Sequence, residues 1–359
     1  MANNKTGIIT FHNGYNPGAV LQCYAIQKSV EKLNFEPTII DFRMLKILKF
    51  NTYNPLFKGL SFKQRLNKIF NYRINKKKYF FYENFIKNYL KTTNIKYFSL
   101  EDLNNNPPIF DYYIAGSDQV WNTVITEENS PAYFLNFVKN FNSSIKISYA
   151  ASFGRYDLDE ITKIKFKSLI KNFNYISVRE KSGFFLLKEL GFDSETVLDP
   201  VFLMSPQDWD LLTNNEYVKD NYILFYMTEK NDLLFKILNF FTKKFNLKVV
   251  NLNKTIYPPE YFPSLIKNST LIITNSFHAT AFSTIFSKPF VTVKHSVSNS
   301  RIENLLELTN QKYRQIDNIN NISNTEIDAL TIYDSSIYQD YLIPEIRKSF
   351  EFLKKALKV

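Results

Sequence analysis

The chain has 359 residues, enough for two domains of ordinary size, and 45% of them are hydrophobic, enough for each domain to bury a core. Its one cysteine, Cys23, excludes an internal disulfide framework and fits a reducing compartment. No run of about 18 apolar residues predicts a membrane span, and the N-terminus lacks the features of a signal peptide, so we expect a cytoplasmic protein.

The first forty residues predict a strand, a helix and a second strand. The strands are expected at Gly7–Phe11 and Thr38–Phe42, where apolar and β-branched residues gather. The helix is expected at Pro17–Leu33, because Asn16 can cap its first turn and Pro17 suits the first helical position. This order is typical of a βαβ unit.

The net charge of +11 is concentrated in a segment from Arg43 to Lys96, which holds 14 lysines and arginines and the single acid Glu83. We expect residues 43–100 to be mostly helical and rich in aromatic side chains. Three interpretations stay open: a solvated helical face with an aromatic core stripe, a contact with an anionic membrane, or a nucleic-acid backbone contact. The first two are favoured, and no nucleic-acid partner is expected.

Two further runs of alternating strand and helix signals follow. In the first half, strands are expected at 112–115, 146–150, 175–178 and 196–198, with a helix from Glu180 to Leu190. In the second half, strands are expected at 222–227, 248–252, 269–273 and 290–293, with a helix from Asp232 to Phe245. Such alternation predicts an α/β fold of two doubly wound, Rossmann-like domains facing a cleft. The expected bounds are 1–205, 206–340 and a last helix within 341–359 that packs back across the domain junction.

The most informative segment is Thr274 to Phe282, because it places His278 where a buried strand gives way to a helix. The free N–H groups of a helix start favour phosphate or carboxylate, and an imidazole there can bind an anion or transfer a proton. An alternative is that His278 only caps the helix or bonds within the core.

Other polar residues also follow predicted strands, and in a parallel sheet such positions lie at one edge. Ser117 and Asp118 follow the strand at 112–115, Arg179 follows that at 175–178, and Lys294 with His295 follows that at 290–293. The chemistry suggested is the handling of a small anion, with Arg179, Lys294 and Arg301 as cationic clamps. The plainer alternatives are an Arg179 ion pair, a surface helix starting at Arg301 and a helix cap at Asp118.

Several other site types are disfavoured. The chain has no Gly-x-Gly-x-x-Gly, no phosphate-binding loop of the Walker type and no Gly-x-Ser-x-Gly elbow. Its three histidines and single cysteine are scattered, which argues against a zinc site.

Taken together, the motifs resemble those of the polysaccharide pyruvyl transferase family. The matching segments are 16–22, 114–122, 177–180, 198–200, 275–282 and 300–303. The chain departs from the usual family pattern in having Asn275 where an aspartate is usual and Ala279 where a glycine is usual.

The resemblance implies a GT-B-like fold and transfer of a pyruvyl group from phosphoenolpyruvate to two hydroxyls of a sugar, forming a cyclic ketal. It implies His278 as general acid, Asp118 as the residue that positions or deprotonates the acceptor, and substrate contacts that include Ser117, Asn275 and Ser276. Arg179, Lys294 and Arg301 would hold the donor, with no metal or cofactor. The acceptor would belong to a capsule, cell-wall or exopolysaccharide precursor, with lipid-linked forms among the candidates and the basic segment on an anionic membrane.

Two competing functions stay open from the sequence. One is a GT-B-type glycosyltransferase that uses a nucleotide sugar, and the other is a non-catalytic protein that binds anionic surfaces.

Overall fold

The computed structural model describes residues 4–139, 144–154, 156, 158–212, 221–294, 300–319 and 322–359. The chain divides into two compact units. Unit 1 comprises Met1–Leu203 and Lys348–Val359, and unit 2 comprises Met204–Arg347. Each unit holds one parallel β-sheet, and each is described by itself.

Unit 1 contains a sheet of six parallel strands in the order β2-β1-β3-β4-β5-β6. The strands are β1 (Lys5–Ile9), β2 (Glu36–Ile39), β3 (Tyr112–Ala115), β4 (Ile145–Ala151), β5 (Tyr175–Val178) and β6 (Glu195–Thr196). The strand order reverses between β1 and β3, where Ile8 pairs with Ile114. Ligands of doubly wound sheets bind outside the carboxyl ends of the strands at such a reversal.

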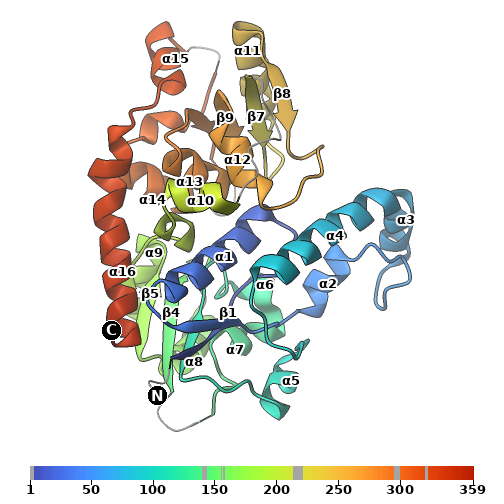
Figure 1. The fold of residues 1–359 in the computed structure, drawn as a ribbon, viewed down its shortest axis with the longest axis vertical. Coiled ribbons are helices and arrows are strands. Elements are labelled where there is room, and N and C mark those ends of the chain that lie inside the picture. The colour runs from blue at the N-terminus through green and yellow to red at the C-terminus, as the bar shows by residue number, and fades with distance from the viewer. Residues whose placement is uncertain are drawn as a thin grey trace. The chain divides into compact units, whose positions relative to one another are not determined.

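Helices cover this sheet, as Figure 1 shows for α1 and for α16. They are α1 (Pro17–Glu31), α5 (Leu100–Asn105), α6 (Thr123–Thr126), α7 (Ser130–Tyr133), α8 (Glu160–Ile170), α9 (Lys181–Glu189) and the last part of α16 (Ile343–Leu357). Helix α1 starts as predicted, because the Asn16 side chain accepts a hydrogen bond of 2.9 Å from the Gly18 N–H and Pro17 occupies the first turn. In the core, Trp121 stacks on Phe134 with ring centroids 5.0 Å apart.

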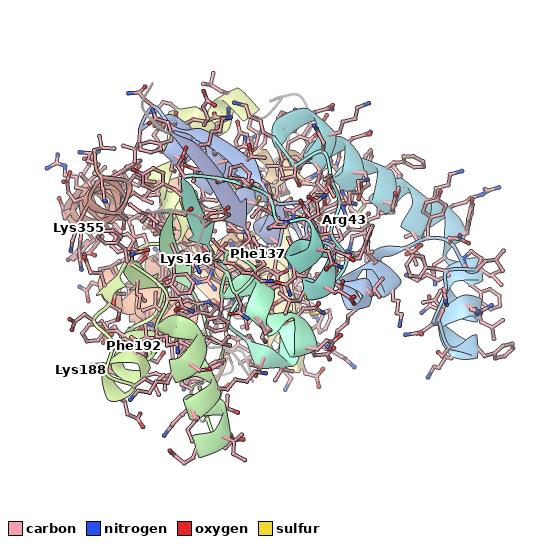
Figure 2. The ribbon with its side chains drawn as sticks, turned by 90° about the horizontal axis from the view of Figure 1, so that it is seen from below. Arg43, Phe137, Lys146, Lys188, Phe192 and Lys355 are labelled. Carbon is pink, nitrogen blue, oxygen red and sulfur yellow. The ribbon has the colours of Figure 1, made fainter. Side chains whose placement is uncertain are left out.

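The basic segment forms α2 (Leu45–Asn51), α3 (Phe62–Phe70) and α4 (Tyr72–Tyr89), so the prediction of a mostly helical segment is confirmed. These helices lie between β2 and β3 in the chain and extend from one side of unit 1 (Figure 1). Figure 2 shows Arg43 where this segment leaves the strands, and the side chains of α3 beyond it.

Unit 2 contains four parallel strands in the order β10-β9-β7-β8. The strands are β7 (Tyr222–Tyr226), β8 (Lys248–Asn251), β9 (Leu271–Thr274) and β10 (Phe290–Thr292). The helices are α10 (Pro206–Leu212), α11 (Asp232–Phe245), α12 (Tyr261–Lys267), α13 (Phe277–Ile285), α14 (Ser300–Leu308), α15 (Asn324–Thr331) and the start of α16. Here the strand order reverses between β7 and β9, which places β9 and the helix that follows it at the second reversal.

Two predicted strands were placed too far along the chain. Strand β1 ends at Ile9 rather than Phe11, and β2 ends at Ile39 rather than Phe42. Residues after β2 leave the sheet because their backbone bonds elsewhere: the Asp41 N–H donates to Thr93 Oγ1 at 3.0 Å, and the Arg43 N–H donates to the Tyr97 carbonyl at 2.7 Å. An apolar run in the sequence does not show at which residue the backbone stops pairing with a neighbouring strand and bonds to another segment instead.

Candidate functional site

The turn after β3 carries the first part of the candidate site. Gly116 has φ of +116°, and a Cβ there would lie 2.2 Å from the Tyr149 carbonyl oxygen, so only glycine fits. The turn holds Ser117 buried and Asp118 at φ of +69°, a conformation that aspartate tolerates better than most residues. Ser117 Oγ accepts from the Asp118 N–H at 2.6 Å and donates to Asp199 Oδ2 at 3.1 Å.

Arg179, directly after β5, lies at the centre of a buried ionic cluster. Its Nη1 lies 2.5 Å from Asp199, its Nε 3.2 Å from Glu180, and its Nη2 3.4 Å from Asp118. Burial opposes the charge of the guanidinium, but the three carboxylates outweigh burial and raise the pKa of Arg179 above its usual value. Arg179 is therefore a permanent cation whose nearest partners are acids.

Among the described side chains, the Arg179 guanidinium is therefore already paired with three carboxyl groups. Asp118 is the most accessible of the four: 13% of its side chain is exposed, against 3% or less for Arg179, Glu180 and Asp199. Asp118 also makes the longest of the three ion-pair contacts. It is the group most able to leave the arginine and contact a ligand.

A second buried network follows β1 and β2. His12 Nε2 lies 2.8 Å from Asp41 Oδ1, which also accepts from Arg43 Nε at 2.6 Å. Burial alone would raise the pKa of Asp41, but its bonds to His12 and Arg43 lower that pKa to about 2. Arg43 in turn donates to Glu83, which also accepts from the Tyr15 hydroxyl at 3.0 Å. The network fixes the loop between β1 and α1.

In unit 2 the strand-to-helix corner has the predicted geometry. Helix α13 begins at Phe277, and the Ser276 hydroxyl caps it by accepting from the Ala279 N–H at 3.4 Å. His278 occupies the first turn, is 7% exposed, and meets the Phe277 ring edge to face at 5.2 Å. The prediction that a helix begins at or near His278 is confirmed.

Asn275, predicted to contact substrate, holds a neighbouring loop in place. Its Oδ1 accepts from the Thr228 N–H at 2.8 Å, and its Nδ2 donates to the Glu229 carbonyl at 2.8 Å. Both loop residues follow β7, so this amide joins the two strand ends at the sheet reversal. A carboxylate could keep the first bond but not the second, which explains asparagine at a position where the family resemblance leads one to expect aspartate.

The two predicted cationic residues of unit 2 differ in setting. Arg301, in the first turn of α14, places its guanidinium 5.8 Å from the centre of the Phe277 ring, beside the start of α13. Lys294 follows β10, its side chain is 60% exposed, and its ammonium lies 3.8 Å from Asp317. Arg301 therefore shares the α13 corner with His278, and Lys294 is a solvated cation near the same sheet edge. His295 lies outside the described residues.

The structure thus joins Ser117, Asp118 and Arg179 in unit 1, and His278, Asn275, Ser276 and Arg301 in unit 2. The sequence analysis did not assign roles to Asp41, Arg43 or Glu83. Glu83 was visible as the only acid of the basic segment, but its partner Arg43 lies 40 residues away. Among the side chains that the structure describes, no group of three or more His, Cys, Asp or Glu is arranged to hold a metal ion.

Within the described part of the chain, no helix is both long enough and apolar enough to cross a membrane.

Two solved structures have the same fold. The chain aligns with a UDP-N-acetylglucosamine 2-epimerase from Rickettsia bellii over 99% of its own length and 96% of that chain, at 12% identity and a TM-score of 0.50. It aligns with a putative UDP-N-acetylglucosamine 2-epimerase from Listeria monocytogenes over 98% and 91%, at 11% identity and a TM-score of 0.50. At these identities the likeness shows the fold alone, which is GT-B-like, with two Rossmann-like domains. No curated protein matches the sequence.

The family model for polysaccharide pyruvyl transferase matches residues 16–297, which is more than half of the chain. The chain therefore belongs to the polysaccharide pyruvyl transferase family. The matched range includes every predicted site residue except Arg301, so the resemblance first seen in separate motifs holds across both units.

Proposed function

We propose that this protein transfers a pyruvyl group from phosphoenolpyruvate to two hydroxyls of a sugar in a capsule, cell-wall or exopolysaccharide precursor, forming a cyclic ketal. The observation that carries the proposal is the family match over residues 16–297. The chemistry at the two sheet reversals supports it, because one offers carboxylates for hydroxyl groups and the other offers donors for an anion.

The donor role falls to the α13 corner of unit 2. Phosphoenolpyruvate carries a phosphate and a carboxylate, which favour helix N-termini and cationic side chains. Arg301 beside Phe277, and Lys294 after β10, supply the positive charge. His278 in the first turn of α13 acts as the acid that protonates the enol carbon. The cap from Ser276 and the Asn275 amide keep this corner rigid.

The acceptor role falls to Asp118 in unit 1. Its contact with Arg179 is the longest of the three ion pairs described for this arginine, and it is the most accessible of those three acids. In this proposal Asp118 accepts the proton of a sugar hydroxyl. Asp199 and Glu180 hold the Arg179 guanidinium in place beside Asp118.

The reaction balances with these groups. His278 gives a proton to C3 of phosphoenolpyruvate while one sugar oxygen bonds to C2 and loses its proton to Asp118. The bond between C2 and the phosphate oxygen then breaks, and the second sugar oxygen bonds to C2 and closes the ring. Of the two hydroxyl protons, one restores the acid and the other leaves with phosphate. A placed general acid contributes on the order of 10² to 10⁴ in rate.

The test supplies the protein with phosphoenolpyruvate and a panel of free, nucleotide-linked and lipid-linked sugars. We expect phosphate release together with an acceptor heavier by pyruvate less water. His278→Gln should lower kcat by about 10²-fold or more, whereas Arg347→Lys, which changes an exposed arginine of α16, should leave it unchanged. Transfer of sugar from a nucleotide sugar, with no reaction of phosphoenolpyruvate, would replace the proposal with a glycosyltransferase.

A further inference from the structure

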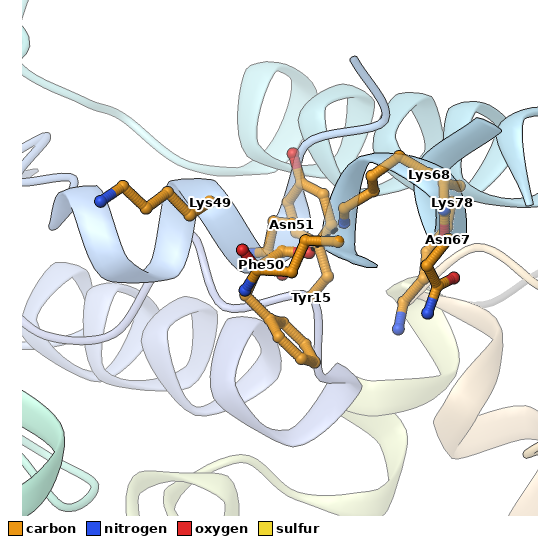
Figure 3. Close-up of a pocket in the computed structure, with 9 residues that line it drawn as sticks. Tyr15, Lys49, Phe50, Asn51, Asn67, Lys68 and Lys78 are labelled. Atoms are coloured by element: carbon orange, nitrogen blue, oxygen red, sulfur yellow. Dashed lines mark hydrogen bonds between the residues drawn. The ribbon is translucent and has the colours of Figure 1, made fainter. Parts of the chain in front are cut away.

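A pocket of about 350 Å³ lies between the β1–α1 loop and the helices of the basic segment in unit 1 (Figure 3). Tyr15 from the loop, Asn51 from α2, Asn67 and Lys68 from α3, and Lys78 from α4 line it. Each of its lining residues that the structure describes is a lysine, a carboxamide or an aromatic residue, and none is acidic. The catalytic roles proposed above use none of them.

Two of the lysines, Lys68 and Lys78, line this pocket, and its described lining includes no acid. Figure 3 shows Lys68 reaching toward Phe50, whose carbonyl accepts from its Nζ at 2.6 Å, and Lys78 beside Asn67, whereas the ammonium of Lys49 points away. Burial lowers the pKa of Lys68, and burial together with the charge of Lys68 lowers the pKa of Lys78. Two like charges held together in this way would be stabilised by an anion between them.

Two carboxamides of α3, Gln64 and Asn67, also line the pocket. Gln64 Oε1 accepts from the Ser61 N–H at 2.8 Å in the capping box of α3, and Asn67 Oδ1 accepts from Asn71 Nδ2 at 2.6 Å. With both oxygens engaged in the helix's own contacts, the NH₂ groups are the parts of these side chains left to meet a ligand. Two ammonium groups and two amide donors form a recognition set for phosphate oxygens.

The pocket also adjoins the sheet edge that carries the candidate site. Asn51 Nδ2 donates to the Asn13 carbonyl at 2.7 Å, in the loop that follows β1. In the same loop Thr10 Oγ1 donates to the Ser117 carbonyl at 3.0 Å, next to Asp118. A ligand with its phosphates in the pocket can therefore extend a sugar along the carboxyl ends of β1 and β3.

We propose that the pocket between the β1–α1 loop and helices α2, α3 and α4 binds the diphosphate that joins the acceptor sugar to its carrier. The inference rests on the proposed pyruvyl transfer, and it assigns to the basic segment the choice of phosphate-linked acceptors over free sugars. The shared chemistry is a sugar diphosphate, carried either by a nucleoside or by a lipid.

The outer face of α3 favours the lipid carrier. Successive helical residues turn by about 100°, which places Phe62, Leu66, Ile69 and Phe70 on the side opposite Gln64, Asn67 and Lys68. These four apolar side chains are 77%, 38%, 56% and 84% exposed. A helix that turns its polar side to a pocket and its apolar side outward, among many lysines, suits the surface of an anionic membrane. A lipid carrier would lie on that side while its diphosphate enters the pocket.

The first test uses inorganic pyrophosphate as the probe and calorimetry as the readout. We expect wild-type protein to bind pyrophosphate, and the double substitution Lys68→Gln and Lys78→Gln to weaken binding about 10- to 100-fold. The matched control is Lys76→Gln with Lys77→Gln, which removes the same charge from exposed positions of α4 and should change affinity less than about threefold. In phosphate-free buffer the pocket variant should be at least as heat-stable as wild type, which verifies its fold. No pyrophosphate binding by wild type, or equal losses in both variants, would overturn the proposal.

The second test compares the two carriers in the transfer reaction, with phosphoenolpyruvate binding measured beside it. The pocket variant should keep its affinity for phosphoenolpyruvate and its KM for that donor, while KM for a diphosphate-linked acceptor rises about 10-fold or more. If phosphoenolpyruvate binds to no form of the protein, the proposed function fails. If phosphoenolpyruvate binds but the pocket variant has the wild-type KM for every diphosphate-linked acceptor, the pocket assignment fails. Phe62→Ser with Phe70→Ser should raise KM only for the lipid-linked acceptor presented in vesicles. If the pocket variant instead raises KM only for the nucleotide-linked acceptor, the diphosphate belongs to a nucleoside carrier.

Discussion

The substitution Asp41→Asn should make the stability of unit 1 depend on pH in a defined window. Hydrogen bonds from His12 and Arg43 lower the pKa of Asp41 from its usual 3.8 to about 2. Each pKa unit is equivalent to about 1.4 kcal/mol, so ionised Asp41 contributes about 2 kcal/mol to the free energy of unfolding. Because the folded-state pKa is the lower one, this contribution is complete above about pH 4 and is lost as the pH falls toward 2.

Urea unfolding followed by tryptophan fluorescence can isolate this effect. The chain has two tryptophans, Trp121 in unit 1 and Trp209 in unit 2, so a Trp209→Phe background reports on unit 1 alone. In that background Asp41→Asn should lower the free energy of unfolding by about 2 kcal/mol at pH 7, and the deficit should shrink between pH 4 and 2. Asp193→Asn, at an exposed acid of the same unit, should cost less than about 0.5 kcal/mol. A deficit below about 0.5 kcal/mol at pH 7, or one that stays constant down to pH 2, would refute this reasoning.

Three further substitutions test the remaining contacts. Arg179→Leu should destabilise unit 1 by about 3 to 5 kcal/mol in urea unfolding, because it removes the guanidinium that pairs with the buried Glu180 and Asp199 and with the partly exposed Asp118; a neutral effect would show that the cluster is solvated. Asn275→Asp should lower the free energy of unfolding of unit 2 by about 1 to 3 kcal/mol, because a carboxylate would face the Glu229 carbonyl, and unchanged stability would remove the proposed role of Nδ2. Ser276→Ala should cost about 0.5 to 2 kcal/mol by thermal unfolding through loss of the α13 cap, and Ser276→Thr should retain most of the stability; equal losses in both would point to a cause other than capping.

Local patterns were enough to predict the parts of the fold that depend on neighbours in sequence. The start of α1 follows from Asn16 and Pro17, and the start of α13 follows from the apolar run before His278 and the small residues after it. The end of β2 was misplaced, because Asp41 and Arg43 bond to residues more than fifty positions away. Helix and strand propensities carry no information about such partners.

The side chains of the candidate site were found by their positions after strands, but their partners were not. Arg179 was expected to hold a small anion, and an ion pair was left as the alternative; the structure shows three acids around it, one of them 61 residues away. The structural task of Asn275 depends on a backbone carbonyl 46 residues earlier. Contacts of this kind are set by strand order, which a single sequence does not display.

The most direct test of pyruvyl transfer is the reaction with phosphoenolpyruvate in heavy water, followed by nuclear magnetic resonance of the modified sugar. The account predicts a ketal whose methyl group carries one deuteron, formed in equal amount with inorganic phosphate, because an exchangeable acid protonates C3. Release of phosphate without a ketal, or a sugar product formed only from a nucleotide sugar, would contradict it.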